Sequence, residues 1–256
     1  MTGLSSIIIT RNEEANIAAC IESVAFADEI IVVDSGSTDR TVELARNAGA
    51  KVFTTSDWPG FGAQKNRALA HASQPWVLAI DADERLTPAL REEILRVVND
   101  PSPRCAGWDM PRKSSFCGQF MAHSGWYPDR VLRLFRRESG RFSDDIVHER
   151  VLVDGPAGQL RNDLLHATYP DLETMLAKLD RYSSASAQAM FERGQRASLL
   201  GAVVRAKWAF IRTYLLRLGF LDGRLGFVLA LSIAETTYYK YVKLWLLCRR
   251  KSASRV

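Results

Sequence analysis

The sequence predicts an α/β protein in which helices flank a mostly parallel sheet and a helical extension follows at the C-terminus. Three observations support this fold class. Short apolar runs alternate with segments of helical periodicity over residues 1–100, as parallel strands alternate with their crossover helices. Two of these runs end in aspartate, at Asp34 and Asp81. From Leu199 onward the chain is both apolar and strongly basic.

The first hundred residues predict strands and helices in alternation. A short continuous apolar run indicates a strand that is buried on both faces. Such runs lie at residues 6–10, 29–34, 51–55 and 76–81. Helices are expected over residues 12–24, 38–48, 63–72 and 88–98. Ser37 or Thr38 is expected to cap the second helix, and Thr87 the fourth, with Pro88 in its first turn.

After residue 99 the pattern changes to that of a mixed region. Strands are expected at residues 107–111, 130–135 and 147–153, and a helix over residues 172–191. A long loop over residues 114–129 carries several aromatic side chains and His123. Long loops inside compact domains are often binding loops, although an ordinary packed loop is the simpler interpretation of this one.

Residues 199–256 predict two helices, over about 199–216 and 225–247, with interleaved basic side chains. Eleven Lys and Arg residues oppose only Asp222 and Glu235, so this extension carries +9 of a chain whose net charge is +5. Neither helix offers the roughly 20 uninterrupted apolar residues of a membrane span. We expect both to lie at a membrane surface with anionic lipid; a helical pair that caps the core is the alternative.

The cysteines indicate a reducing compartment. No two of them have the close spacing of a zinc site or a redox motif, and the chain start lacks the basic head of a signal peptide. We therefore expect a cytoplasmic protein with free thiols. The four cysteines are Cys20, Cys105, Cys117 and Cys248.

Asp81 and Asp83 follow the most apolar of the expected strands. If the backbone stays extended, both carboxylates project to one side, roughly 7 Å apart at their Cα atoms. Such a pair suits Mg²⁺ or Mn²⁺, which take carboxylate oxygens and share their other positions with water and phosphates. A strand-to-helix turn is the alternative. Because Asp34 and Asp81 would reach the same edge of a parallel sheet, a nucleotide site is favoured.

Together, four segments resemble glycosyltransferase family two, whose members have a GT-A (Rossmann-like) fold and use nucleotide-activated sugars. They are residues 6–17, 31–39, 62–66 and 81–83. Later segments resemble the branch of β-1,4-glucosyltransferases that extends the inner-core heptose of lipopolysaccharide. Those segments are residues 133–135, 147–149, 166–169, 178–182 and 219–223. The resemblance covers nearly the whole chain, and its later motifs are less specific.

The resemblance implies an inverting, metal-dependent transfer of a sugar to a lipid-linked glycan acceptor. The donor would be UDP-glucose and the acceptor a lipopolysaccharide inner-core heptose; another nucleotide sugar or another acceptor is the alternative. We expect a GT-A domain over residues 1–198, with a nucleotide-sugar half (1–100) and an acceptor half (101–198). The extension, residues 199–256, would hold the protein at the inner face of the bacterial inner membrane.

The resemblance also implies which residues bind the nucleotide. Thr10, Asn12 and Glu13 would line it at the end of the first strand. Asp34 would accept hydrogen bonds from the base or ribose, since a carboxylate is a good acceptor for imide and hydroxyl protons. Lys65 would face the diphosphate. The alternatives are a turn residue for Asp34 and a solvated helix face for Lys65.

Three residues are implied for a divalent metal, Mg²⁺ or Mn²⁺. Asp83 would ligate it, Asp81 would help to hold both the nucleotide and the metal, and His166 would complete the metal shell or touch phosphate. The metal would neutralise the departing diphosphate. A hydrogen-bonded structural histidine is an equal interpretation of His166.

An inverting transfer needs a carboxylate that takes the proton of the acceptor hydroxyl. Glu149 is the first candidate, because the segment 148–149 occupies the position that the resemblance gives to the base. Asp145 and Asp144 are rivals, and the usual acidic pair of the family is absent in its common form.

Two other functions fit the sequence less well. A sugar nucleotidyltransferase has a related sheet but normally needs a glycine-rich phosphate loop after its first strand, and residues 10–14 contain no glycine. A nucleic-acid-binding module would explain the basic extension. The apolar, helical character of that extension favours lipid, so we expect no nucleic-acid partner.

Overall fold

The computed structural model describes residues 3–143 and 149–253, and the chain divides into two compact units. The first unit comprises Met1–Arg112 and Asp129–His166, and the second comprises Lys113–Pro128 and Ala167–Val256. The domain boundary that we expect at residue 198 stays a prediction.

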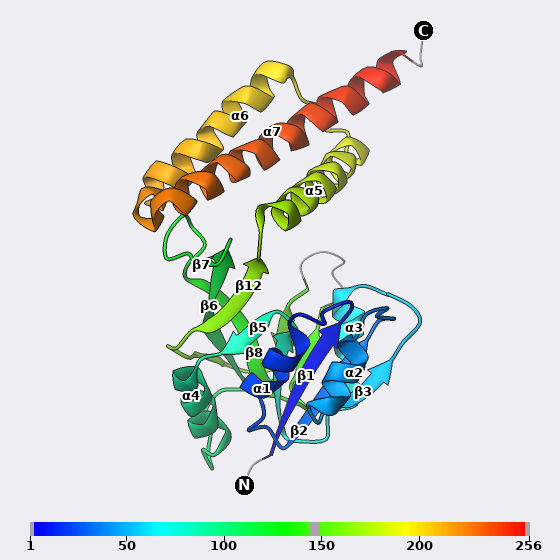
Figure 1. The fold of residues 1–256 in the computed structure, drawn as a ribbon, viewed down its shortest axis with the longest axis vertical. Helices are drawn as coiled ribbons and strands as arrows, with labels where there is room; N and C mark the ends of the chain where they lie inside the picture. Colours follow the sequence, from blue (N-terminus) through cyan, green and yellow to red (C-terminus); the bar gives the residue numbers. More distant parts are fainter. Residues whose placement is uncertain (1–2, 144–148, 254–256) are drawn as a thin grey trace. The chain divides into compact units, whose positions relative to one another are not determined.

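Four parallel strands form one half of the sheet of the first unit, and part of this sheet is labelled in Figure 1. They are β1 (Leu4–Thr10), β2 (Glu29–Asp34), β3 (Lys51–Thr54) and β4 (Trp76–Asp81), in the order β3-β2-β1-β4. Every residue of β1 and β2 is buried. This burial explains why these strands are apolar runs without alternation.

Helices cover both faces of this parallel half, because successive strand residues point to opposite sides. On one side Ile8 and Leu78 pack with side chains of α1 (Ile17–Ser23) and α4 (Pro88–Val98). On the other side Ile7 and Val77 pack with Ala68 of α3 (Phe61–Ala70). The two apolar layers explain how the central strands lose all contact with water.

Two helices begin later than the sequence predicts, because their first residues are tied to neighbouring loops. Asn12 has a left-handed backbone with φ of 56°, and α1 starts at Ile17. The predicted caps of α2 (Thr41–Asn47) are wrong, since Ser37 donates to the Asp34 carboxylate and the Thr38 N–H donates to the Asn12 side chain. The cap of α4 is confirmed, with the Leu90 N–H 3.2 Å from the Thr87 hydroxyl.

The other half of the sheet is mixed, as the sequence predicts. Beyond β4 the order is β8, β6, β12 and β5, and β8 runs antiparallel to β4. The strands are β5 (Glu84–Leu86), β6 (Gly107–Phe116), β8 (Asp129–Arg136) and β12 (Leu164–Tyr169). The short strands β7 (Gln119–Phe120) and β11 (Ala157–Gln159) pair with β6, whereas β9 (Gly140–Phe142) and β10 (Val151–Val153) form a separate two-stranded sheet. Of the strand expected at residues 147–153, residues 147 and 148 lie outside the described part of the chain.

The second unit is mainly helical (Figure 1). Its helices are α5 (Leu172–Glu192), α6 (Leu199–Ile211), a π-helical turn (Arg212–Leu216), a short 3₁₀ helix (Gly219–Asp222) and α7 (Gly223–Ala253). The long helix α7 contacts both α5 and α6. No helix in the described residues has the length and apolarity that a membrane crossing requires.

Asp222 anchors the aromatic loop of the second unit. Its buried carboxylate accepts hydrogen bonds from the N–H groups of Ala122 and His123, at 3.0 and 3.1 Å, and from the hydroxyl of Ser124 at 2.7 Å. The His123 ring nitrogen Nδ1 lies 3.2 Å from the same carboxylate. The segment 219–223 that we singled out in the sequence therefore fixes the loop backbone.

Candidate active site

The acidic strand ends share one edge of the sheet, which confirms the central geometric expectation. In the parallel register Thr10 lies beside Asp34, and Ile9 lies beside Asp81. The carboxyl ends of β1, β2 and β4 therefore meet at one rim. In open α/β sheets this is the edge at which ligands bind.

The loops after β1 and β2 are joined at this rim by Asn12 and Glu13. The Asn12 N–H donates to the Ser37 hydroxyl at 2.8 Å, and its side-chain oxygen accepts from the Thr38 N–H at 2.8 Å. The Glu13 N–H donates to the Thr41 hydroxyl at 2.8 Å. Both predicted nucleotide residues thus shape the rim through their backbones, and their contact with a nucleotide stays a prediction.

Thr10 and Asp34 lie beneath these loops. The Thr10 hydroxyl is buried and has no hydrogen-bond partner among the described residues. Asp34 is 1% exposed, and its carboxylate accepts from the N–H groups of Gly36 and Ser37, at 3.0 and 2.9 Å, and from the Ser37 hydroxyl. Gly36 has a φ of 79°, a left-handed backbone that glycine adopts without strain. Asp34 therefore sets the shape of its own loop.

Asp81 lies between two cations. Its Oδ1 is 2.8 Å from Lys65 Nζ, and its Oδ2 is 2.5 Å from a guanidinium nitrogen of Arg133. Burial would raise the pKa of the Asp81 carboxyl, but the charges of Arg133 and Lys65 outweigh burial and hold the pKa well below its usual range. Asp81 is therefore an ionised carboxylate with both oxygens engaged by the protein.

Lys65 connects Asp81 to the predicted base. The Lys65 side chain is 4% exposed, and its Nζ lies 2.8 Å from Glu149 Oε1 as well as 2.8 Å from Asp81. The structure places Lys65 between two carboxylates, and its expected contact with a diphosphate stays a prediction. The Glu149 side chain is 18% exposed. Asp144 and Asp145, its rivals for the role of base, lie outside the described residues.

Arg133, Glu84 and Arg112 complete this charged cluster, and sequence reasoning did not assign them roles. The Glu84 carboxylate is fully buried and accepts from the Asp81 N–H at 2.9 Å, from Arg133 at 2.7 Å and from Arg112 at 3.3 Å. Burial lowers the pKa of Arg133, but Asp81 and Glu84 outweigh it, so the pKa lies above its usual value. The position of Arg133 inside an apolar strand could have indicated this cluster in the sequence, because a buried charge needs partners of opposite charge.

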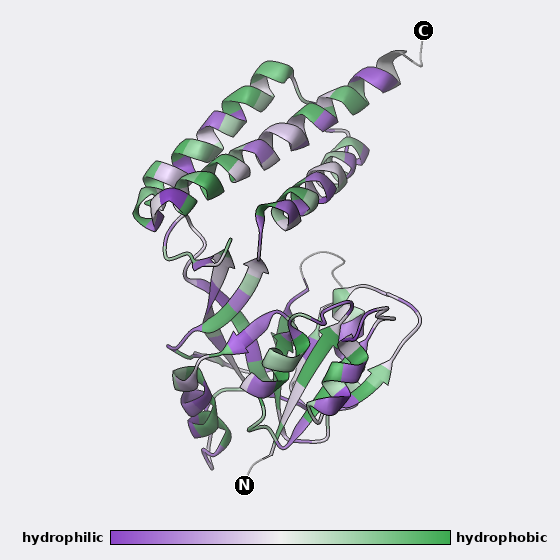
Figure 2. Ribbon diagram, in the orientation of Figure 1, coloured by the Kyte–Doolittle hydropathy of each residue, from purple (hydrophilic) through white to green (hydrophobic). Residues whose placement is uncertain are grey.

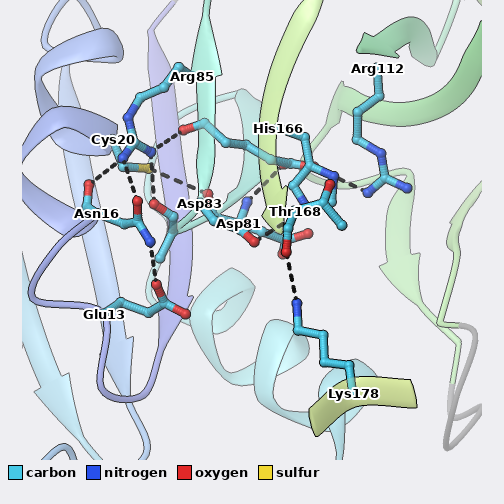
Figure 3. A network of polar contacts seen from close by, with 12 residues as sticks. Glu13, Asn16, Cys20, Asp81, Asp83, Arg85, Arg112, His166, Thr168 and Lys178 are labelled. Carbon is cyan, nitrogen blue, oxygen red and sulfur yellow. Dashed lines mark hydrogen bonds and ion pairs between the residues drawn. The ribbon is translucent and has the colours of Figure 1, made fainter. Parts of the chain in front are cut away.

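Asp83 faces His166 rather than Asp81. The backbone turns at Ala82 and Asp83, directly after β4, so the extended arrangement of the two aspartates is wrong. Strand β12 pairs with β5 and sets His166 beside Glu84. The His166 Nε2 atom then lies 3.3 Å from Asp83 Oδ2 (Figure 3).

Arg85 holds this turn in place (Figure 3). Its guanidinium donates to the carbonyl oxygens of Ala82 at 2.8 Å, Glu84 at 2.7 Å and Asn16 at 2.7 Å. The Asn16 amide in turn donates to the Glu13 carboxylate at 2.9 Å. The turn that carries Asp83 is therefore tied to the start of α1.

The Asp83–His166 pair fits a divalent cation with a partial protein shell. No three His, Cys, Asp or Glu side chains gather as a metal site in the part of the chain that the structure describes. A carboxylate oxygen and an imidazole nitrogen are donors that Mn²⁺ accepts, with water and phosphate oxygens at the remaining positions. Because Asp81 is engaged by Lys65 and Arg133, it fits the metal less well than Asp83 does.

A cleft of about 500 Å³ opens beside this cluster, entirely within the first unit. It brings together three of the predicted site residues: Lys65, Asp81 and Glu149. The remaining lining comes from β6, from β8, from the end of β9, and from the start of β10 with the residue before it. Those residues are Arg112, Asp129, Arg130, Val131, Leu132, Arg133, Phe142, Arg150 and Val151.

An α/β sheet whose acidic strand ends meet beside a polar cleft is typical of enzymes that bind nucleotide-linked substrates. The model of glycosyl transferase family 2 matches residues 5–153 of this chain. The chain is also 35% identical over 251 residues to the lipopolysaccharide core biosynthesis glycosyltransferase LpsC of Rhizobium meliloti (strain 1021), with 93% of each protein covered. The chain therefore belongs to glycosyl transferase family 2.

Two solved structures are similar over part of the chain. Mannosyl-3-phosphoglycerate synthase from Rubrobacter xylanophilus is 20% identical, with a TM-score of 0.49 over 75% of this chain and 73% of that one. Glucosyl-3-phosphoglycerate synthase from Mycobacterium tuberculosis, in complex with Mn²⁺, UDP-glucose and phosphoglyceric acid, is 28% identical, with a TM-score of 0.35 over 44% and 43%. The family match and the observed sheet together confirm the predicted α/β, GT-A-type fold class.

Proposed function

We propose that this glycosyltransferase moves a sugar, with inversion, from a nucleoside diphosphate to a hydroxyl group of a lipid-linked glycan. The observation that carries the proposal is the shared rim of β1, β2 and β4, where Thr10 lies beside Asp34 and Asp81 borders a cleft that contains Glu149. A donor on the rim would place its sugar towards the cleft. The acceptor would then enter from the side of β8.

The rim suits a nucleoside diphosphate and a divalent metal. Thr10, Asn12, Glu13 and Asp34 would line the nucleoside, because they or their loops form the ends of β1 and β2. Asp83 and His166 would hold Mg²⁺ or Mn²⁺. When bound, such an ion neutralises charge on the leaving diphosphate as a Lewis acid.

Glu149 is proposed as the general base. The acceptor hydroxyl oxygen forms a bond to the anomeric carbon of the donor sugar as the bond from that carbon to the diphosphate oxygen breaks. The diphosphate leaves with the electron pair, and the hydroxyl proton passes to the Glu149 carboxylate. A single displacement of this kind inverts the anomeric centre. Asp145 remains the alternative base.

The relative LpsC supports a more specific acceptor. Its name places it in lipopolysaccharide core biosynthesis, and the alignment spans both units of this chain. We propose UDP-glucose as the donor and an inner-core heptose of lipopolysaccharide as the acceptor. An acceptor of this kind is anchored in a membrane, so the protein would work at the inner face of the bacterial inner membrane.

A turnover assay tests this function. The protein is incubated with UDP-glucose, Mg²⁺ and a lipid-linked heptose acceptor, and release of UDP and the mass of the glycan are followed. We expect UDP and a product heavier by one hexose, in equal amounts. The Glu149→Gln variant should slow the transfer by roughly 100-fold or more while it still binds UDP. Absence of any nucleotide-sugar binding by calorimetry would contradict the proposal.

A further inference from the structure

Three successive residues of α3 reach three different parts of the first unit. The Gln64 amide donates to the hydroxyls of Ser35 and Thr55, each at 2.9 Å, in the loops after β2 and β3. Lys65 pairs with Asp81 and Glu149. The side chain of Asn66 exchanges two hydrogen bonds with the backbone of Phe142, at 3.0 and 2.9 Å. One turn of helix therefore connects the loops after β2 and β3 to residues that line the cleft.

The same helix lies unusually close to the chain around Glu149. A Cβ atom added to Gly62 would lie 2.0 Å from the Ser143 carbonyl oxygen and 3.5 Å from the Glu149 Cβ atom. No ordinary side chain fits such a space without a shift of the backbone. Gly62 and Asn66, one helical turn apart, thus hold α3 against Phe142 and Ser143.

The charges around Lys65 favour a role in which this lysine holds the Glu149 carboxylate. Lys65 is buried, and a buried ammonium group is stable only when opposite charges surround it. Asp81 has a second cation, Arg133, on its other oxygen. Among the described residues, Lys65 is the cation that contacts Glu149. A direct contact between Lys65 and a diphosphate would require this lysine to leave two carboxylates at 2.8 Å.

We propose that Lys65 is a positioning residue that holds the carboxylate of Glu149 towards the acceptor, and that Gly62 and Asn66 clamp the chain that carries Glu149. This inference rests on the proposed function, in which Glu149 is the base. An ion pair at a buried lysine limits the rotamers of the glutamate. A base must lie within hydrogen-bond reach of the hydroxyl that it deprotonates, and a displacement of about 1 Å can cost roughly 100-fold in rate.

A double-mutant cycle tests the inference. We expect Lys65→Met to lower kcat by about 10- to 100-fold and to leave the Kd of UDP, measured by calorimetry, within about twofold. The UDP affinity also shows that the variant folds. If Lys65 acts through Glu149, the variant Lys65→Met/Glu149→Gln should be no slower than Glu149→Gln alone, within about twofold.

Two further variants distinguish an effect on the proposed clamp from a general loss of stability in α3. Gly62→Ala displaces the chain at Ser143, so kcat should fall while the Kd of UDP stays unchanged. Ala70→Ser changes an exposed residue at the end of the same helix. It should leave kcat and the UDP affinity at their original values.

The outcomes are distinguishable. If Lys65→Met weakens UDP binding by tenfold or more, or if the double variant is much slower than Glu149→Gln, then Lys65 acts on the diphosphate and the inference fails, while the proposed function stands. If Glu149→Gln retains full turnover, Glu149 is not the base, and both the inference and that part of the proposed function are overturned.

Discussion

Three aspartates near the rim have three different environments, and these decide what each can do. Asp34 is closed inside its own loop by N–H groups of that loop. Asp81 is an ionised partner of Lys65 and Arg133. Asp83 stands in a turn opposite His166, 24% exposed. Asp83 is therefore the carboxylate best placed to accept a metal from solution.

Replacement of Asp83 by alanine should remove the metal without loss of the fold. We expect Mn²⁺ affinity, measured by titration with paramagnetic detection, to fall by about tenfold or more, and turnover by about 100-fold. The melting temperature should change little, because the side chain is partly exposed. Asp154→Ala, at an exposed position with 80% of its side chain accessible, is the control. Unchanged Mn²⁺ affinity in Asp83→Ala would remove Asp83 from the metal site.

Glu29 is a buried carboxylate whose oxygens accept hydrogen bonds from several groups of the protein. Its oxygens lie 2.6 Å from the hydroxyl of Ser5, 2.6 Å from the N–H of Ser73 and 3.0 Å from Lys51 Nζ. Burial raises the pKa of Glu29, but these hydrogen bonds outweigh burial and lower it from 4.5 to about 2. The ionised form is therefore the one that the folded protein stabilises.

This lowered pKa predicts a loss of stability in acid. Because the folded-state pKa lies below the unfolded one, the contribution of Glu29 is fully present above pH 4.5 and is lost as the pH falls towards 2. At pH 7 the Glu29→Gln variant should have a free energy of unfolding about 2 kcal/mol lower than that of the unmodified protein. As the pH falls from 4.5 to 2, the variant should lose less stability than the unmodified protein, because it has no carboxylate to protonate at this position. Denaturant titrations at several pH values measure this; parallel curves for the two proteins would refute it.

At the scale of elements, the sequence predicted what local patterns determine. The apolar runs of β2 and β4 gave both strands with their correct ends at Asp34 and Asp81. The cap of α4 was also predictable, because Thr87 and Pro88 act within one turn. The starts of α1 and α2 were not, since Asn12 bonds to Ser37 and Thr38, residues remote in the chain.

The charged cluster around Asp81 also could not be predicted from local sequence patterns. Arg133 lies 49 residues from Glu84 and 52 from Asp81, and no periodicity relates them. The turn at Asp83 depends on Arg85 and on the pairing of β5 with β12. Sequence patterns could place acids at the rim, but only the tertiary contacts decide which acid faces a cation and which faces His166.

Helix α6 and the turns that follow it present an apolar surface in the second unit, and Figure 2 shows apolar residues along α6. Leu200 is 75% exposed, Trp208 54% and Leu216 62%. Basic side chains are interleaved with them in the sequence, at Arg205, Lys207, Arg212 and Arg217. Apolar and cationic groups on one element suit an anionic bilayer surface. Lys243 is not available for this, because it binds Asp180 in α5.

A pair of substitutions on this surface tests the membrane contact. We expect Leu200→Glu/Leu216→Glu to reduce sedimentation with vesicles of anionic phospholipid by about tenfold or more, because two apolar anchors become charges. Leu176→Glu, at an exposed position of α5, is the matched control and should have a smaller effect. Neutral vesicles should bind the unmodified protein weakly. Undiminished binding of the double variant would show that another partner covers this surface.

At the scale of the whole molecule, the two units divide the chemistry. The rim, the Asp83–His166 pair and the cleft all belong to the first unit, and the apolar, basic helices belong to the second. The basic excess that the sequence shows begins at residue 199, inside the second unit. It did not show that α5 groups with α7, because their contacts, such as Lys243 with Asp180, join residues 63 positions apart.

The most direct measurement is a crystal structure of the full chain soaked with UDP and Mn²⁺. We predict that the uracil and ribose lie over the ends of β1 and β2, beside Thr10 and Asp34, and that anomalous scattering places Mn²⁺ next to Asp83 and His166, against the diphosphate. Lys65 should still contact Glu149. A nucleotide bound away from this rim, or Mn²⁺ bound without Asp83, would contradict the account.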